Sequence, residues 1–399
     1  MPFPLRTLFL CVSIATLSSC HRDLRQPADN QVISIGRKET IHSSVLNEDR
    51  PVMIYVPPYS VGSGRKFSVL YLLDGDAHFH SVSGLIQILG TGINGTNVVP
   101  EMIVVAIPNT DRTRDLTPSH SMMMDGKEQD FLKTSGGGQT FLKFVETELI
   151  PYVESHYPTH PYRVLVGHSF GGIAAINALY QKPDLFDAFI AIDPSFWFDD
   201  HLLLNKADSF FSTNKLENKY LFLAQANTLG PQNENNDHFG SIKEYEKVLA
   251  SPKNTSGIKW AYKYYPDDSH GSVPIISEYD GLRFIFKDFT PNYAAFEKDP
   301  DALKRNFAQY KMPPPEFVIN RLGYNALGRD DLTLAQQYFQ MNLDSYPKSS
   351  NAHDSMGELL LKKGDTTGAL QMYQKALDLD GNNNNARKVI HDILEGKKK

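Results

Sequence analysis

The chain has 399 residues, a length that predicts two or three domains rather than one. Hydrophobic residues make up 41% and charged residues 22%, a balance typical of globular proteins that excludes a disordered or fibrous chain. The 40 basic and 46 acidic residues are well mixed and sum to a net charge of −6. Nucleic acid is therefore not expected as a partner, because phosphate binding needs a concentrated basic face.

The first 20 residues have the pattern of an export signal. Arg6 precedes the apolar run 8–15, which is too short to span a bilayer as a folded helix. The following Leu17-Ser18-Ser19-Cys20 resembles a bacterial lipobox, in which the cysteine is acylated. We expect residues 1–20 to be a lipoprotein-type signal, Cys20 to carry a lipid anchor, and residues 21–30 to form a polar tether. Such a protein would be an exported bacterial lipoprotein that faces the periplasm or lies at the outer membrane. The alternative is an ordinary signal peptide with an incidental cysteine.

Between residues 31 and 290, apolar strand patterns alternate with helical patterns. Several of the strand runs are almost continuously apolar, as strands in the centre of a parallel sheet are. The predicted strands are 52–57, 67–73, 102–107, 162–166, 188–192, 220–226 and 260–265, and the predicted helices lie around 79–90, 139–156, 171–181, 238–250 and 272–288. This alternation predicts an α/β fold with a mostly parallel central sheet that helices cover on both faces.

The composition changes after about residue 290. Residues 291–315 include three consecutive prolines and are predicted to be a linker. Residues 316–399 have no strand pattern, and the chain there repeats itself at an offset of 34 residues. The equivalent pairs are Gly323 and Gly357, Ala335 and Ala369, Phe339 and Tyr373, Leu343 and Leu377, and Pro347 and Gly381. This period resembles tetratricopeptide repeats and predicts a small all-α region of about two repeats with a closing helix at 383–395.

Two such repeats bury little surface by themselves, so we expect them to pack against the α/β domain. They could bind a peptide or protein partner, mediate self-association or cover the cleft of the α/β domain. A concave face with exposed aromatic residues would favour binding, and a buried face would favour a lid.

The strand 162–166 runs directly into Gly167-His168-Ser169-Phe170-Gly171-Gly172, and an alanine-rich helical pattern follows. The pattern G-x-S-x-G between a strand and a helix is typical of a nucleophile elbow, a sharp turn that exposes the serine Oγ. Glycine is needed at 167 and 171 because the neighbouring chain passes close by. Ser169 is therefore predicted to be a nucleophile. The alternative is a purely structural turn.

A serine nucleophile needs a general base, and His270 is the candidate. It follows the last predicted strand and precedes a helix, which places it at the same edge of the sheet as Ser169. Its imidazole could accept the Oγ proton and later pass it to the leaving group.

The acid that would orient this base is harder to choose. In proteins with a nucleophile elbow, the acid commonly lies in a loop that follows one of the later strands. The corresponding strand here is 220–226, and the loop after it contains Glu234 and Asp237. We prefer Asp237, with Glu234 next. Asp193, which follows the preceding strand, is a further position, and a serine–histidine dyad without an acid is the remaining alternative.

An oxyanion hole needs two backbone N–H groups that point at the carbonyl oxygen of the substrate. One is the residue after the nucleophile, Phe170. The other is expected from the turn after the strand 67–73, where Gly75 allows a close approach of the backbone and Asp76 or Ala77 would donate.

Four segments together resemble an esterase family that includes S-formylglutathione hydrolase (esterase D) and the siderophore esterases of the enterobactin-hydrolase kind. They are Tyr71–Gly75, Ile107–Pro118, Gly167–Gly172 and Asp193–Trp197. The likeness covers roughly residues 31–290 and is closest to a periplasmic subgroup with C-terminal tetratricopeptide repeats. It implies an α/β-hydrolase that cleaves esters.

The resemblance also implies substrate contacts. In the family the loop Arg114-Asp115-Leu116-Thr117-Pro118 lies near the active site, so Arg112 or Arg114 could bind an acidic group of the substrate, and Trp197 is a further candidate. The alternative for either arginine is a structural salt bridge to Asp115 or Asp111. Members of the family often have serine where Asp193 stands, so this sequence departs from the family at that position.

The leading hypothesis is a serine carboxylesterase that acts on a siderophore ester, an acylated sugar or another small ester. One alternative is a membrane-tethered scaffold whose repeats bind partners and whose hydrolase domain is inactive. Another is a thioesterase or peptidase that uses the same residues, since leaving-group preference depends on pocket shape. No cofactor or metal is expected: the sequence has no dinucleotide fingerprint, and His78 and His80 lack an evident third ligand.

Overall fold

An eight-stranded mixed sheet forms the centre of the protein, in a computed structural model that describes residues 33–58, 64–91, 97–124, 126–229, 236–290 and 292–396. The strand order is β1-β2-β4-β3-β7-β8-β9-β10. The strands are β1 (Arg37–Ser43), β2 (Glu48–Tyr55), β3 (Phe67–Leu73), β4 (Met102–Ile107), β7 (Thr159–His168), β8 (Ala188–Ile192), β9 (Tyr220–Ala226) and β10 (Lys259–Tyr265). The six strands from β4 to β10 in this order run parallel, and β1 and β2 add an antiparallel edge. The predicted α/β class with a mostly parallel sheet is confirmed.

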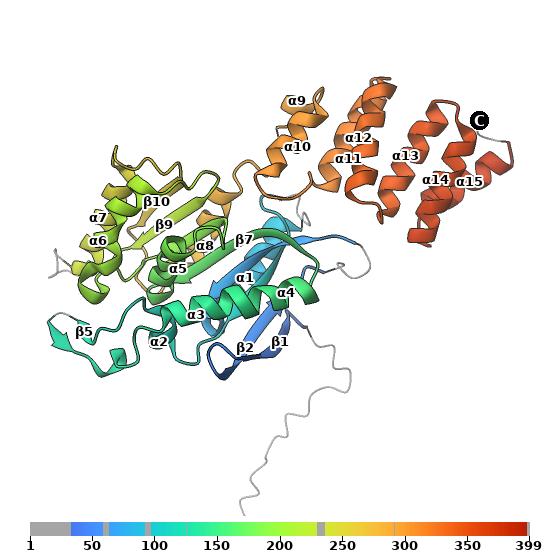
Figure 1. Ribbon diagram of the computed structural model, residues 1–399. Coiled ribbons are helices and arrows are strands. Elements are labelled where there is room, and N and C mark those ends of the chain that lie inside the picture. Colours follow the sequence, from blue (N-terminus) through green and yellow to red (C-terminus); the bar gives the residue numbers. More distant parts are fainter. Residues whose placement is uncertain are drawn as a thin grey trace, which may run out of the picture. The chain divides into compact units, whose positions relative to one another are not determined.

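Helices cover both faces of this sheet (Figure 1). Successive residues of a strand point to opposite faces, so in β3 Val69 and Tyr71 belong to one core while Leu70 and Leu72 belong to the other. One core is completed by α3 (Gly138–Phe144), α4 (Ile150–His156), α5 (Phe170–Gln181), α6 (Phe198–Thr213) and α7 (Asp237–Ala250), and the other by α1 (Gly75–Gly90) and α8 (Val273–Ile285). Every residue of β3, β4, β8 and β9 is buried, which explains their continuous apolar sequences.

Residues 291–315, predicted to be a linker, are folded instead. They contain α9 (Tyr293–Phe296) and α10 (Pro300–Ala308). Leu303 and Phe307 of α10 are fully buried in the core that also contains α1 and α8. The linker prediction was wrong because it was based on the three consecutive prolines, whereas the apolar residues of this segment pack into the core beside the sheet.

The C-terminal region consists of α11 (Glu316–Gly328), α12 (Leu332–Ser345), α13 (Ser350–Lys362), α14 (Thr366–Leu379) and α15 (Asn384–Leu394). The 34-residue offset corresponds to two helix pairs. Gly323 of α11 faces the ring of Phe339, and Gly357 of α13 faces the ring of Tyr373, so that a Cβ at either glycine would lie within 3.1 Å of the ring. Small residues at these two positions therefore allow each helix pair to pack closely. From Ile35 onward the chain forms one compact unit.

Several predictions concern residues that the structure does not describe. The signal sequence, Cys20 and the tether lie outside the described residues, as does Glu234. Among the helices that the structure describes, none combines the length and apolar composition that a membrane span requires.

Candidate active site

Ser169 lies on a strained turn between β7 and α5, as the motif predicts. Its backbone has φ 60° and ψ −114°, a region that residues other than glycine rarely adopt. A Cβ at position 167 would lie 2.1 Å from the carbonyl oxygen of Gly171, and one at position 172 would lie 2.9 Å from Cα of Pro194. Glycine is therefore required on both sides of the serine, and the turn holds its side chain at the carboxyl edge of the sheet.

The Oγ of Ser169 has a hydroxyl neighbour that the sequence did not suggest. It lies 3.1 Å from Oγ of Ser195, a residue that is 2% exposed. The backbone N–H of Ser195 also donates to the carbonyl oxygen of Ser169. The turn after β8 is thus bonded directly to the turn after β7.

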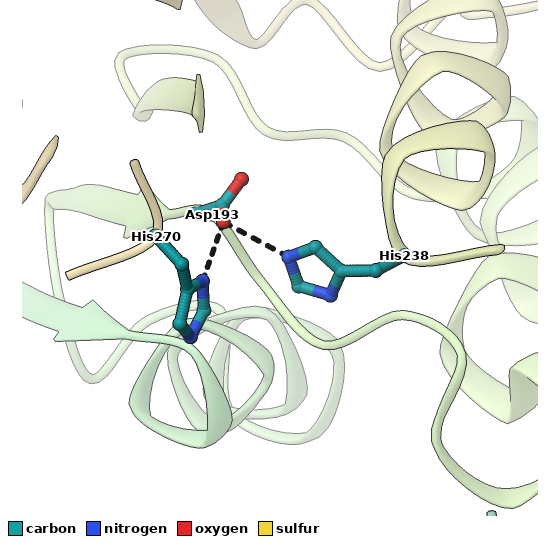
Figure 2. Close-up of side chains that lie close together, drawn as sticks. All are labelled: Asp193, His238 and His270. Carbon is teal, nitrogen blue, oxygen red and sulfur yellow. Dashed lines mark hydrogen bonds and ion pairs between the residues drawn. The ribbon is translucent and has the colours of Figure 1, made fainter. Parts of the chain in front are cut away.

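His270 follows β10 and lies beside a buried carboxylate at the same edge of the sheet (Figure 2). Its Nδ1 is 2.6 Å from Oδ2 of Asp193, whose side chain is fully buried. An ionised carboxylate only accepts hydrogen bonds, so Nδ1 carries the proton and Nε2 keeps its lone pair. This is the tautomer that a general base needs.

Asp193, and not Asp237, is the acid that pairs with His270. The carboxylate of Asp237 is 2.8 Å from Nε2 of His201 instead. The sheet order explains the difference: β8 lies directly beside β7, and Asp193 ends β8 in a turn with φ 42° that aims its side chain across the strand ends. Asp237 begins α7, past the loop that follows β9, and its side chain is half-exposed.

The carboxylate of Asp193 is held by three hydrogen bonds. Its Oδ2 accepts from His270 and, at 2.9 Å, from Nε2 of His238, while its Oδ1 accepts the backbone N–H of Ala226 at 2.9 Å. Burial alone would raise the pKa of this carboxyl group, but the bonds from the two histidines outweigh it and hold the pKa of Asp193 below its usual range. Asp193 is therefore an anion at neutral pH. The sequence prediction missed His238 entirely.

A metal ion could in principle be bound by Asp193, His238 and His270, whose possible ligand atoms lie within 4.8 Å of one another. This is the group of that kind among the residues that the structure describes. Both nitrogens lie 2.6–2.9 Å from the same carboxylate oxygen. Two ligands on one tetrahedral zinc ion would be separated by about 3.3 Å. The distances are those of hydrogen bonds, which account for the cluster without an ion.

The predicted oxyanion donors occupy the first turns of two helices. Phe170 begins α5 and Asp76 lies in the first turn of α1, where backbone N–H groups have no acceptor within the helix. The two turns are adjacent, since a Cβ at Gly171 would touch the side chain of Asp74 at 3.2 Å. The N–H of Ala77 donates to the carbonyl oxygen of Asp74, so of the two predicted residues Asp76 is the better placed donor.

Arg112 and Arg114 are both engaged in ion pairs. Arg114 pairs with Asp115, as the structural alternative stated, whereas the partner of Arg112 is Asp74 and not Asp111 or Asp115. Arg112 binds the two carboxylate oxygens of Asp74 at 2.6 and 2.9 Å. Arg114 binds Glu48 and Asp115, each at 2.7 Å. The ion pairs of these guanidinium groups connect the segment after β4 to the turn after β3 and to the start of β2.

Trp197, the third predicted substrate contact, is partly buried beside the residue that follows the nucleophile. Its ring centre lies 5.8 Å from that of Phe170, and Trp197 occupies the N-cap position of α6. Its position beside the elbow is compatible with a contact to the substrate.

Three polar residues, His168, Glu278 and His78, lie in the interior next to the candidate site. His168, the residue before the nucleophile, has its ring centre 4.4 Å from that of His270 and its Nε2 without a hydrogen-bond partner among the described residues. Burial lowers the pKa of His168 to about 3. Glu278 of α8 lies 3.4 Å from Nδ1 of His78, and burial raises the pKa of Glu278 to about 8. His78 therefore belongs to this interior group and not to a pair with His80.

Comparison with known proteins agrees with this geometry. The family model described as "Putative esterase" matches residues 43–240. The ferri-bacillibactin esterase BesA of Bacillus subtilis is 29% identical over 281 residues, which cover 66% of this chain and 94% of BesA. A siderophore enterobactin esterase of Emericella nidulans is 28% identical over 261 residues, covering 56% of this chain and 83% of that protein.

Among solved structures, an IroE-like serine hydrolase from Shewanella oneidensis superimposes with a TM-score of 0.69 at 30% identity. The match covers 77% of this chain and 99% of the Shewanella protein. The matched family, the near-complete coverage of these relatives and the geometry around Ser169 agree with one another. The chain belongs to this esterase family and is a carboxylic ester hydrolase.

Proposed function

We propose that the protein hydrolyses esters through a covalent acyl-enzyme on Ser169, with His270 as the general base and Asp193 as the acid that orients it. The observation that carries the proposal is the 2.6 Å bond between the buried carboxylate of Asp193 and Nδ1 of His270. It leaves Nε2 of His270 as the proton acceptor at the edge of the sheet where Ser169 emerges.

In the first half of this reaction Oγ of Ser169 attacks the ester carbonyl carbon while Nε2 of His270 takes the hydroxyl proton. The negative charge that develops on the carbonyl oxygen would be met by the N–H groups of Phe170 and Asp76, a contribution worth a few kcal/mol per donor in other hydrolases. The proton on His270 then passes to the leaving alkoxide. In the second half water attacks the acyl carbon while His270 takes a proton from it. His270 then returns this proton to Oγ of Ser169 as the bond between Oγ and the acyl carbon breaks and the carboxylic acid is released.

We propose siderophore esters as the substrate class. The support is the names of two relatives, one a ferri-bacillibactin esterase and the other a siderophore enterobactin esterase, both matched over more than four-fifths of their length. Arg112 and Arg114 are engaged in ion pairs, so an acidic siderophore that contacted them would share these guanidinium groups with carboxylates of the protein.

The direct test is hydrolysis of p-nitrophenyl esters from acetate to octanoate, beside hydrolysis of a tricatecholate trilactone followed by chromatography of the released monomers. Ser169→Ala and His270→Ala should abolish turnover of both, and a fluorophosphonate should label the unchanged protein but not the Ser169→Ala variant. An unlabelled Ser169 together with no turnover of any ester would refute the mechanism. Turnover of simple esters without cleavage of the trilactone would refute only the substrate class.

We also propose that Cys20 anchors the protein to a membrane and that it faces the periplasm. The support is the apolar run 8–15 followed by the lipobox-like Leu17–Cys20. Fractionation of cells that express the full chain should find it with the membranes, and Cys20→Ser should release it or block its processing. An unchanged distribution would count against the anchor.

A further inference from the structure

His238 makes a direct contact with the acid of the proposed site, at the same carboxylate oxygen as His270. Its Nε2 is 2.9 Å from Oδ2 of Asp193, the same oxygen that accepts from Nδ1 of His270 (Figure 2). The two imidazole rings are nearly perpendicular, at 88°, with their centres 5.1 Å apart. One carboxylate oxygen therefore receives two histidine donors from different elements.

The ring of His238 is held firmly in this position. His238 is the second residue of α7, and its backbone N–H donates to the side chain of the N-cap residue Asn236. The start of α7 is tied to the sheet because Gln225 of β9 donates to the carbonyl oxygen of Phe239. The His238 side chain is 13% exposed, so water competes little for its bond to Asp193.

We infer that His238 is a positioning residue of the esterase site, which acts through Asp193 by fixing the orientation of its carboxylate. Rotation of the carboxylate about its last side-chain bond would turn the His270 ring with it, and the bond from the N–H of Ala226 to Oδ1 opposes this rotation. The bond from His238 is a further one that rotation must break, and it holds Oδ2, the oxygen to which His270 donates. The base is thereby kept in the orientation that presents Nε2 to Ser169.

This inference rests on the proposed function, since His238 can matter only if Asp193 orients the base. If His238 acts in this way, replacing it should lower kcat, because the chemical step is slower, and leave KM unchanged, because substrate binding is not affected. The effect should also vanish once Asp193 has lost its charge.

The experiment compares four variants of the purified protein on a p-nitrophenyl ester: His238→Phe, His238→Gln, Asp193→Asn and the double variant His238→Phe/Asp193→Asn. Phenylalanine keeps the ring volume but donates nothing, whereas the amide nitrogen of glutamine can take the place of Nε2. His201→Phe is the matched control, because it also removes a histidine that lies 2.8 Å from a carboxylate, but this carboxylate is that of Asp237 in α7 and not that of Asp193.

His238→Phe should lower kcat about 10- to 100-fold, the range expected for a lost hydrogen bond to a charged group, with KM within about twofold. His238→Gln should stay within about threefold of the unchanged protein, and His201→Phe within about twofold. In the Asp193→Asn background, His238→Phe should cost no more than about a further twofold, because residues that act as one unit are not additive.

Thermal unfolding and circular dichroism establish that each variant is folded. If His238→Phe does not fold, His238→Asn provides the same comparison, since its shorter amide stops short of Asp193. Full activity of His238→Phe beside an inactive Asp193→Asn variant would overturn the role of His238 and leave the proposed function standing. An equal loss in both backgrounds would show a structural role only. Full activity of Asp193→Asn would overturn both proposals.

Discussion

Asp193 and His270 are 77 residues apart in the sequence, and Oδ2 of the one lies 2.6 Å from Nδ1 of the other. The contact joins the end of β8 to the turn after β10, across the intervening strand β9. Because the carboxylate is fully buried while the imidazole is 41% exposed, the acid is shielded and the base can be reached from solvent.

Asp193→Asn should lower kcat about 10³- to 10⁴-fold, since an asparagine amide favours the wrong tautomer of the base. Asp237→Asn should stay within about twofold of the unchanged protein, because this carboxylate contacts His201 and not His270. Steady-state hydrolysis of p-nitrophenyl acetate by both variants decides between them. The reverse ranking would restore the acid that the sequence favoured.

Arg112→Ala should reduce stability rather than change substrate preference. Arg112 neutralises Asp74, which is 6% exposed, so its removal leaves a buried carboxylate with the Asn109 amide as its side-chain donor and no opposite charge, at a cost of about 2–3 kcal/mol. Arg112→Lys should recover only part of this, since an ammonium group cannot bind both oxygens in the same planar geometry.

Urea unfolding measures the loss of stability in both Arg112 variants, and KM values for a neutral ester and an acidic ester test the alternative. An increase in KM confined to the acidic ester, with unchanged stability, would favour the substrate contact that the family resemblance implies.

Gly167→Ala should destabilise the fold strongly, by at least about 3 kcal/mol, because its Cβ would lie 2.1 Å from the carbonyl oxygen of Gly171. Gly84→Ala is a suitable control, since nothing lies within 4 Å of the added Cβ in α1. Thermal unfolding should show a large decrease in Tm for the first variant and little change or a small increase for the second. A normal Tm for Gly167→Ala would contradict the tight turn.

Glu278 should make the protein less stable as the pH rises. Burial raises the pKa of Glu278 to about 8, above its value in the unfolded chain, so the native state binds more protons than the unfolded state between these two values. The free energy of unfolding should therefore fall with increasing pH in this range, by about 2 kcal/mol between pH 6.5 and pH 8.

Glu278→Gln should remove this slope and be the more stable protein at pH 8. Urea unfolding of both proteins between pH 6.5 and pH 8 measures the difference, because every other titrating group is common to the two proteins. Identical slopes for the two proteins would show that Glu278 is ionised at neutral pH, for example through a closer contact with His78.

The sequence by itself determined those features that depend on residues close together in the chain, namely strands, turns and repeats. The strands 67–73, 102–107, 188–192 and 220–226 match β3, β4, β8 and β9 residue for residue, because strands that are buried on both faces of a parallel sheet have nearly continuous apolar sequences. The turn at Ser169 could be predicted from five residues, since only glycine fits where the chain passes so closely. The 34-residue offset likewise predicted the two C-terminal helix pairs.

The tertiary structure alone decided how side chains from distant segments pair. Asp193, Glu234 and Asp237 all follow predicted strands, and no local pattern tells which carboxylate reaches His270; the order of β7, β8, β9 and β10 does. The same holds for Arg112, whose partner Asp74 lies on another strand end, and for His238, whose role depends on where α7 begins. A hydrogen bond requires a separation of about 3 Å and a defined direction, and these are set by the packing of whole elements against one another.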